Sequence, residues 1–134
     1  MQIGLVGLQF SGKTTLFNTL AKKEIEASSK EEASIEVVKI PDDRLDQLTK
    51  IFNPKKQVNA TIEVFDIPGL KMSEDNKVKI TSTFLNAVRN NDALFYIVRG
   101  FEDQSVSHPM ESINPLRDIE FLETEYLLSD MAFL

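Results

Sequence analysis

The chain has 134 residues, with 21 acidic and 15 basic side chains, a net charge of −6 at pH 7 and no cysteine. This length suits a domain that buries a sizeable hydrophobic core. The absence of cysteine excludes disulfides and thiol chemistry, and the acidic balance disfavours a general nucleic-acid-binding protein. The sequence holds neither an uncharged apolar run of about 18 residues nor a signal-peptide pattern, so we expect a cytoplasmic protein.

Four apolar runs predict β-strands, at residues 2–7, 35–40, 60–66 and 93–98. Apolar residues at helical spacing predict helices from residue 15 onward and at residues 41–52, 77–90 and 115–134. Strands that alternate with helices favour an α/β fold with a mainly parallel sheet. The first and last runs are apolar almost throughout, as expected of strands covered on both faces.

Residues 7–15 read GLQFSGKTT, directly after the first predicted strand. They match the P-loop pattern G-x-x-x-x-G-K-[ST], in which backbone N–H groups at a helix N-terminus surround a polyphosphate. Lys13 supplies a point charge for the outer two phosphates and is expected to face solvent before a ligand binds, while Thr14 supplies a hydroxyl ligand for Mg²⁺. The predicted nucleotide contacts of this segment are Phe10, Ser11, Gly12, Lys13, Thr14 and Thr15.

Residues 22–34, KKEIEASSKEEAS, are charged, rich in serine and nearly devoid of apolar side chains. This composition predicts a solvated loop. In P-loop GTPases the segment after the first helix closes over the γ-phosphate, and we therefore expect this loop to be mobile without a triphosphate.

The run VFDIPGL, residues 64–70, ends the third predicted strand with an acid and a glycine. A carboxylate at the end of a strand beside a P-loop is placed to hold Mg²⁺ through water, which is the expected role of Asp66. Gly69 is expected to offer its N–H to the γ-phosphate and to act as a pivot.

These two motifs and the segments around them resemble the Obg-like YchF family of translational-type P-loop GTPases and ATPases. The resemblance rests on five segments in family order: MQIGLVG…GKTTLFNTL, VKIPDDRLDQLTKIFNPKK, ATIEVFDIPGL, FLNAVRNNDALFYIVRGFED and NPLRDIEFLETEYLLSD. It implies a three-layer P-loop NTPase fold that binds GTP or ATP with Mg²⁺ and associates with ribosomes through further domains. Members closest to YchF often prefer ATP to GTP.

The resemblance also gives Leu70 a catalytic position. Leu70 stands where Ras-like GTPases place the glutamine that orients the attacking water, and the family has a hydrophobic residue there. Because leucine forms no hydrogen bond with water, we expect hydrolysis to be slow or to use another water-orienting group. Lys13, with Gly12 and the P-loop amides, is the residue expected to stabilise charge in the transition state.

Three features depart from the family pattern. Gln9-Phe10-Ser11 replaces Pro-Asn-Val and places a bulky ring over the expected phosphate position. The threonine that coordinates Mg²⁺ in the first switch has two alternative counterparts, Lys30 or Ser34, depending on the alignment. Residues 71–81, KMSEDNKVKIT, replace a glycine-rich second switch, which is expected to weaken its contact with the γ-phosphate.

The family reads the purine with an N-K-x-D or N-x-x-E motif after a fifth strand, and no residue after 100 supplies this motif. We therefore expect a chain truncated before the base-recognition strand, and the sequence does not predict a preference between GTP and ATP. The expected division is a partial nucleotide-binding domain at 1–114 and the start of a helical coiled-coil insertion at 115–134.

The leading hypothesis is a Mg²⁺-dependent GTP- or ATP-binding domain of a YchF-like GTPase, with slow hydrolysis or a switch role. The alternative is a non-catalytic regulatory or scaffolding module with weak or lost nucleotide binding, which the altered switches and the missing base-reading motif favour. A kinase-type P-loop transferase would need an acceptor site and a lid, and the sequence indicates neither.

For four other polar residues we expect neither a catalytic nor a ligand-binding role. His108 lies in the polar loop SVSHPM and is expected at the surface, without a metal to bind. Arg89, Arg99 and Arg117 are expected to be solvated or ion-paired rather than to stabilise charge on a nucleotide.

The expected order of strands places the first strand between the third and the fourth. Residues 94–98 would then form an apolar edge with unpaired backbone groups, open to another chain. The last helix would lack a packing partner for Tyr126, Leu127, Met131 and Phe133. We therefore expect the chain to self-associate.

Overall fold

The computed structural model describes residues 1–22, 34–70 and 80–132. Within these ranges the chain forms four strands and four helices: β1 (Gln2–Val6), α1 (Lys13–Leu20), β2 (Ser34–Lys39), α2 (Asp43–Phe52), β3 (Thr61–Asp66), α3 (Ser82–Arg89), β4 (Ala93–Tyr96) and α4 (Pro115–Met131). Every predicted strand and helix is present, with ends that differ by a few residues. Almost all of the predicted mobile loop and of the second switch lie outside the described residues.

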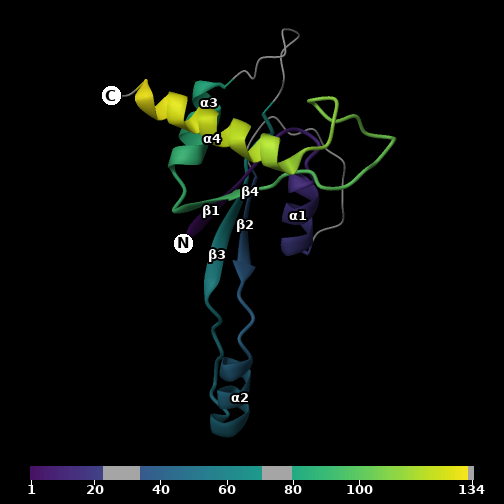
Figure 1. Ribbon diagram of the computed structural model, residues 1–134. Helices are drawn as coiled ribbons and strands as arrows, with labels where there is room; N and C mark the ends of the chain where they lie inside the picture. The colour runs from purple at the N-terminus through teal and green to yellow at the C-terminus, as the bar shows by residue number, and fades with distance from the viewer. Residues whose placement is uncertain (23–33, 71–79, 133–134) are drawn as a thin grey trace.

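The four strands form one sheet in the order β2-β3-β1-β4 (Figure 1). β1 pairs in parallel with both β3 and β4, whereas β2 pairs with β3 in antiparallel orientation. The predicted mainly parallel sheet is therefore confirmed, and so is the place of the first strand between the third and the fourth. β2 is antiparallel because it and β3 form the two arms of one long hairpin that carries α2 at its far end (Figure 1).

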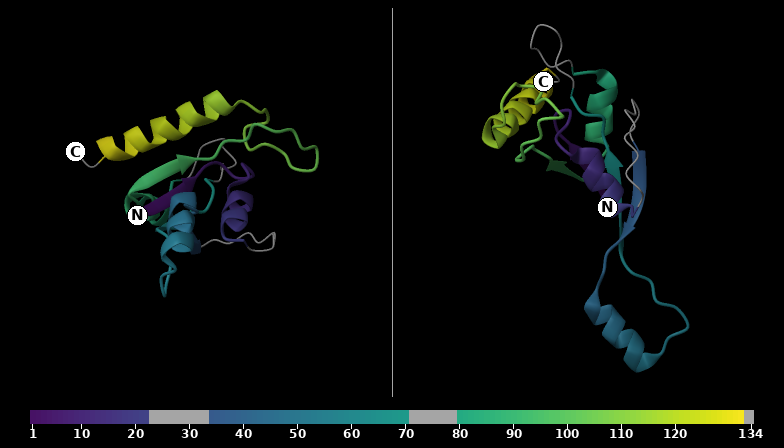
Figure 2. Two further views of the ribbon diagram at one scale, coloured as in Figure 1. Left: turned by 90° about the horizontal axis from the view of Figure 1, so that it is seen from below. Right: turned by 90° about the vertical axis from the view of Figure 1, so that its right-hand side faces the viewer.

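Helices cover both faces of the sheet, which gives three layers (Figure 2). Consecutive side chains of a strand point to opposite faces, and β1 is buried on both. Leu5 packs with Phe17 of α1 on one face. Val6 packs on the other face with Phe84 of α3 and Leu122 of α4. The sheet is thus held between α1 and the pair α3–α4, and the predicted three-layer α/β fold is confirmed.

The last helix has a packing partner, contrary to the expectation for Tyr126. Leu122 is fully buried, and the Tyr126 ring stacks on Phe84 at 6.3 Å and on Tyr96 at 5.9 Å between ring centroids. Burial raises the pKa of the Tyr126 hydroxyl, which has no hydrogen-bond partner within the described structure. The expectation arose because the sequence alone does not show that α4 folds back across β4 and α3.

The helix α2 is stabilised locally and lies apart from the core. Asp42 caps its N-terminus by accepting a hydrogen bond from the N–H of Arg44 at 3.0 Å, and Asn53 ends it in the left-handed conformation, at φ 45°. None of its residues is buried, and Phe52 is 74% exposed. Its apolar stripe therefore contributes nothing to the core formed by the described residues.

Leu122→Ala should lower the free energy of unfolding by about 2–5 kcal/mol, because it empties a buried position between α4, α3 and the sheet. Leu127→Ala is the matched control on the same helix, at a side chain that is 64% exposed. It should change this free energy by less than about 0.5 kcal/mol. Urea unfolding followed by circular dichroism measures both, and equal effects would contradict the anchoring role of Leu122.

Candidate functional site

The P-loop connects β1 to α1 in a turn that needs glycine at two positions. Gly12 has φ 91°, in the left-handed region that L-residues with side chains avoid. At Gly7 a Cβ would lie 2.3 Å from the carbonyl oxygen of Ile97, so only glycine permits this close approach to the end of β4. Phe10 also has a positive φ, 62°, which costs on the order of 1–2 kcal/mol for a residue with a side chain.

Lys13 is the first residue of α1 and is already paired. Its Nζ lies 3.2 Å from Oδ1 of Asp66, and the hydroxyl of Thr14 donates to Oδ2 of the same carboxylate at 2.8 Å. The expectation that Lys13 faces solvent is wrong, because its side chain is only 8% exposed. A buried ammonium requires a partner, and Asp66 supplies it across 53 positions of sequence.

The Asp66 carboxylate and the Thr14 hydroxyl bring two hard oxygen donors to one point. Ser34 lies directly opposite Asp66 in the β2–β3 pairing, and residues opposite each other in an antiparallel pair share a face of the sheet. Within the described residues no group of three His, Cys, Asp or Glu side chains could hold a metal. This donor set fits Mg²⁺, which takes one or two protein oxygens and completes its shell with water and phosphate.

The segment after β3 pairs with the P-loop. Leu8 and Leu70 form a parallel bridge: the N–H of Leu70 donates to Gly7 at 3.2 Å, and the N–H of Gln9 donates to Leu70 at 3.3 Å. Gly69 is pressed so closely on the P-loop that a Cβ there would lie 3.2 Å from Cα of Gln9. Leu70 itself is 3% exposed and belongs to the hydrophobic core, so its side chain has no access to water.

The other P-loop residues that were predicted to contact the nucleotide differ in how far they are exposed to solvent. Phe10 is 56% exposed and Thr15 is exposed at the start of α1. Ser11 is buried, and its hydroxyl has no hydrogen-bond partner in the described structure. The first N–H groups of an α-helix have no partner inside the helix, so the backbone of this segment retains donors for an anion.

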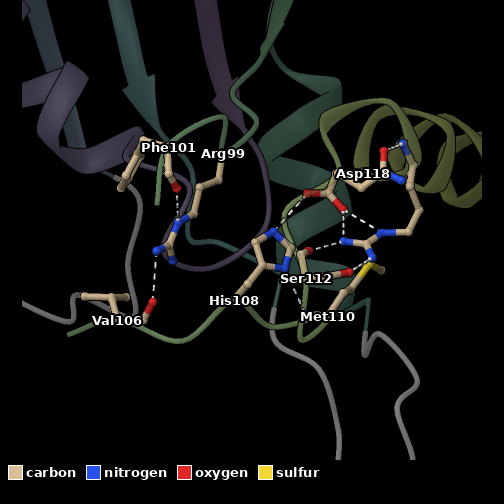
Figure 3. Close-up of polar contacts among 9 residues, drawn as sticks. Arg99, Phe101, Val106, His108, Met110, Ser112 and Asp118 are labelled. Atoms are coloured by element: carbon tan, nitrogen blue, oxygen red, sulfur yellow. Dashed lines mark hydrogen bonds and ion pairs between the residues drawn. The ribbon is translucent and has the colours of Figure 1, made fainter. Parts of the chain in front are cut away.

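Arg99 holds the loop after β4 in place and was not predicted to do so. Its guanidinium is buried and donates to the carbonyls of Phe101 at 3.1 Å and Val106 at 2.9 Å (Figure 3). It also donates to the carbonyl of Asp103 at 3.2 Å. It also lies over the Phe101 ring, 4.8 Å from the centroid. A Cβ added at Gly12 would be 3.8 Å from that ring, so this loop forms one side of the P-loop region.

His108 is not a surface residue, which corrects the prediction from its polar loop. Its side chain is 4% exposed and its Nε2 lies 3.0 Å from Asp118, itself buried and also bound by Arg117 (Figure 3). The N–H of Met110 donates to Nδ1, so Nε2 is the ring nitrogen that can donate to Asp118. The sequence does contain one sign that His108 is buried, namely its partner Asp118. Asp118 is four residues before Leu122 and therefore lies on the buried face of α4.

A family model described as "50S ribosome-binding GTPase" matches residues 2–128 of the chain. Two curated proteins illustrate the similarity. Obg-like ATPase 1 of Oryza sativa subsp. indica is 36% identical over 138 residues, covering 100% of this chain and 35% of that protein. Ribosome-binding ATPase YchF of Escherichia coli O157:H7 is 39% identical over 132 residues, covering 96% and 36%. The chain thus spans about a third of the length of these relatives.

The structural comparison agrees with the sequence comparison. The structure of the YchF GTPase of Schizosaccharomyces pombe superimposes with a TM-score of 0.74 at 32% identity, covering 99% of this chain and 36% of that one. Among the described helices of this protein, none is long and apolar enough to cross a membrane.

His108→Ala should lower the free energy of unfolding by about 1–3 kcal/mol, because it leaves the buried carboxylate of Asp118 with one partner fewer. Ser107→Ala, at the exposed neighbouring position, is the control and should have almost no effect. Urea unfolding at pH 7.5 provides the measurement. An unchanged unfolding midpoint for His108→Ala would refute the bridging role of the imidazole.

Proposed function

Because the chain belongs to the 50S ribosome-binding GTPase family, we propose that it binds GTP or ATP, together with Mg²⁺, on the P-loop. The observation that supports this most directly is the convergence of Lys13, Thr14 and Asp66 at the start of α1. An ammonium, a hydroxyl and a carboxylate in that arrangement are the groups that a magnesium–phosphate complex needs. The match to the family favours this function over a scaffold without nucleotide.

Binding would exchange the partners of these groups. The phosphates would attract Lys13 away from Asp66, and the carboxylate would then be free to hold the metal with Thr14. Ser34, opposite Asp66 in the sheet, is a further candidate ligand. When bound, Mg²⁺ would neutralise charge on the β- and γ-phosphate oxygens. The nucleotide and the metal are therefore expected to strengthen each other's binding.

The backbone contacts would come from the P-loop and from Gly69. The N–H groups from Phe10 to Thr15 lie at or before the start of α1, where the helix dipole favours an anion. Gly69 is held against Gln9, which would bring its N–H to the γ-phosphate. Lys13 and these amides would stabilise the charge that develops during phosphoryl transfer to water.

We propose that hydrolysis is slow and that it switches the protein between a triphosphate-bound and a diphosphate-bound state. The side chain of Leu70 is in the core, and it therefore offers no hydrogen bond to an attacking water at the position where Ras-like GTPases carry glutamine. The altered first and second switches add to this expectation. We further propose a cytoplasmic protein that binds the ribosome, because the name of the Escherichia coli relative describes that protein as ribosome-binding. Residues 115–134 are proposed to be the start of a helical insertion.

Lys13→Ala should weaken the affinity for ATP and GTP by at least about tenfold, because it removes a charged hydrogen-bond donor worth roughly 1.5–3 kcal/mol. Titration of fluorescent nucleotides with and without Mg²⁺ gives the dissociation constants. Thr14→Ala should weaken binding only when Mg²⁺ is present, since its hydroxyl is assigned to the metal.

Lys50→Ala is the matched control, since Lys50 is an exposed lysine on α2, far from the P-loop (Figure 1). It should leave the affinity unchanged. Thermal unfolding must accompany the Lys13→Ala measurement, because Asp66 then loses its cation. A folded Lys13→Ala protein with the affinity of the unmutated chain would disprove nucleotide binding at the P-loop.

The chain is also proposed to self-associate through β4. This strand is at one end of the described sheet, and its Phe95 is 51% exposed. Phe95→Lys should shift the protein toward monomer at high concentration, because a lysine on an edge strand opposes pairing. Light scattering after size exclusion measures the mass. Phe52→Lys on α2 is the control, and a monomeric unmutated chain would contradict the proposal.

A further inference from the structure

Neither the backbone nor the side chain of Leu70 can form a hydrogen bond with an attacking water molecule. Its N–H and C=O are both used, by Gly7 and Gln9 respectively, and its side chain is 3% exposed in the core. Moving its backbone would break both hydrogen bonds, and turning its side chain out of the core would leave a buried position empty. A water that attacks the γ-phosphate therefore needs a polar group from another residue.

The same pairing brings Gln9 to the place where that group is needed. Gly69 packs directly against the backbone of Gln9, because a Cβ added at Gly69 would lie 3.1 Å from N and 3.2 Å from Cα of Gln9. The N–H of Gly69 is the group proposed to contact the γ-phosphate. Gln9 is also four residues before Lys13 in the same turn. It is thus the residue at which the P-loop and the segment after β3 meet.

The carboxamide of Gln9 is available for this task. The residue is partly exposed, and in the described structure its side chain makes no hydrogen bond, while its backbone N–H is held by Leu70. A carboxamide offers two N–H donors and one oxygen acceptor. It can therefore accept a hydrogen bond from a water molecule and donate one to a phosphate oxygen at the same time.

We propose that Gln9 orients the attacking water, in place of the residue at position 70; this inference rests on the proposed nucleotide hydrolysis. The water oxygen forms a bond with the γ-phosphorus, and the bond from that phosphorus to the β–γ bridging oxygen breaks. The nucleoside diphosphate leaves with the electron pair of that bond. The water proton passes to the released phosphate or to solvent, and Gln9 neither gains nor loses a proton.

The test is single-turnover release of phosphate from saturating Mg²⁺–ATP and Mg²⁺–GTP, measured with the dissociation constants. Gln9→Ala should slow hydrolysis by about tenfold or more, the scale of one hydrogen bond lost in the transition state, and should leave the dissociation constants within about twofold. Gln9→Leu, which keeps the bulk of the side chain, should behave like Gln9→Ala. Gln47→Ala on α2 is the control and should match the unmutated chain.

Three outcomes would overturn the inference. If the unmutated chain hydrolyses nucleotide and both variants keep its rate, Gln9 has no role and the proposed function stands. If the variants lose affinity in proportion to rate, Gln9 binds nucleotide without orienting water. If the unmutated chain binds nucleotide but releases no phosphate, both this role and the proposed hydrolysis are wrong. The Gln9→Leu variant decides the matter if Gln9→Ala does not fold.

Discussion

Asp66 accepts hydrogen bonds from both Lys13 and Thr14, and both members of its ion pair with Lys13 are almost fully removed from water. Leaving one of these charges buried alone would cost several kcal/mol, so the pairing fixes the start of α1 against the end of β3. The P-loop is the connection between β1 and α1, and its position follows from this contact. The same groups are those that a phosphate and a metal would use, so a ligand has to replace existing partners.

Two further contacts hold the P-loop from opposite sides. On one side, the backbone of Gly7 and Gln9 pairs with Leu70, which joins the loop to the segment after β3. On the other side, Arg99 organises the loop after β4 and keeps Phe101 beside Gly12. Preorganised donors around an anion cost less to align when the ligand arrives. The buried pair of His108 and Asp118 anchors the far end of that second loop to α4.

Much of the fold and part of the site could be predicted from local patterns. The apolar run of β1 marks a strand because this strand is covered on both faces and has no water-facing side. The spacing of glycine, lysine and threonine marks the P-loop because few residue types tolerate its backbone and its charge. His108 was misjudged for the opposite reason: a polar loop with one histidine looks solvated, and its partner Asp118 lies in a separate element.

By itself, then, the sequence determined the order of strands and helices, the P-loop pattern between the first strand and the first helix, and the acid at the end of the third strand. These depend on side-chain periodicity and on residues adjacent in the chain. Only the tertiary structure decided that Lys13 is buried against Asp66, that Tyr126 stacks between α3 and β4, and that Gln9 meets Gly69. Each of these contacts joins residues more than 25 positions apart, and no local pattern encodes a distance between segments that only the packing of the core brings together.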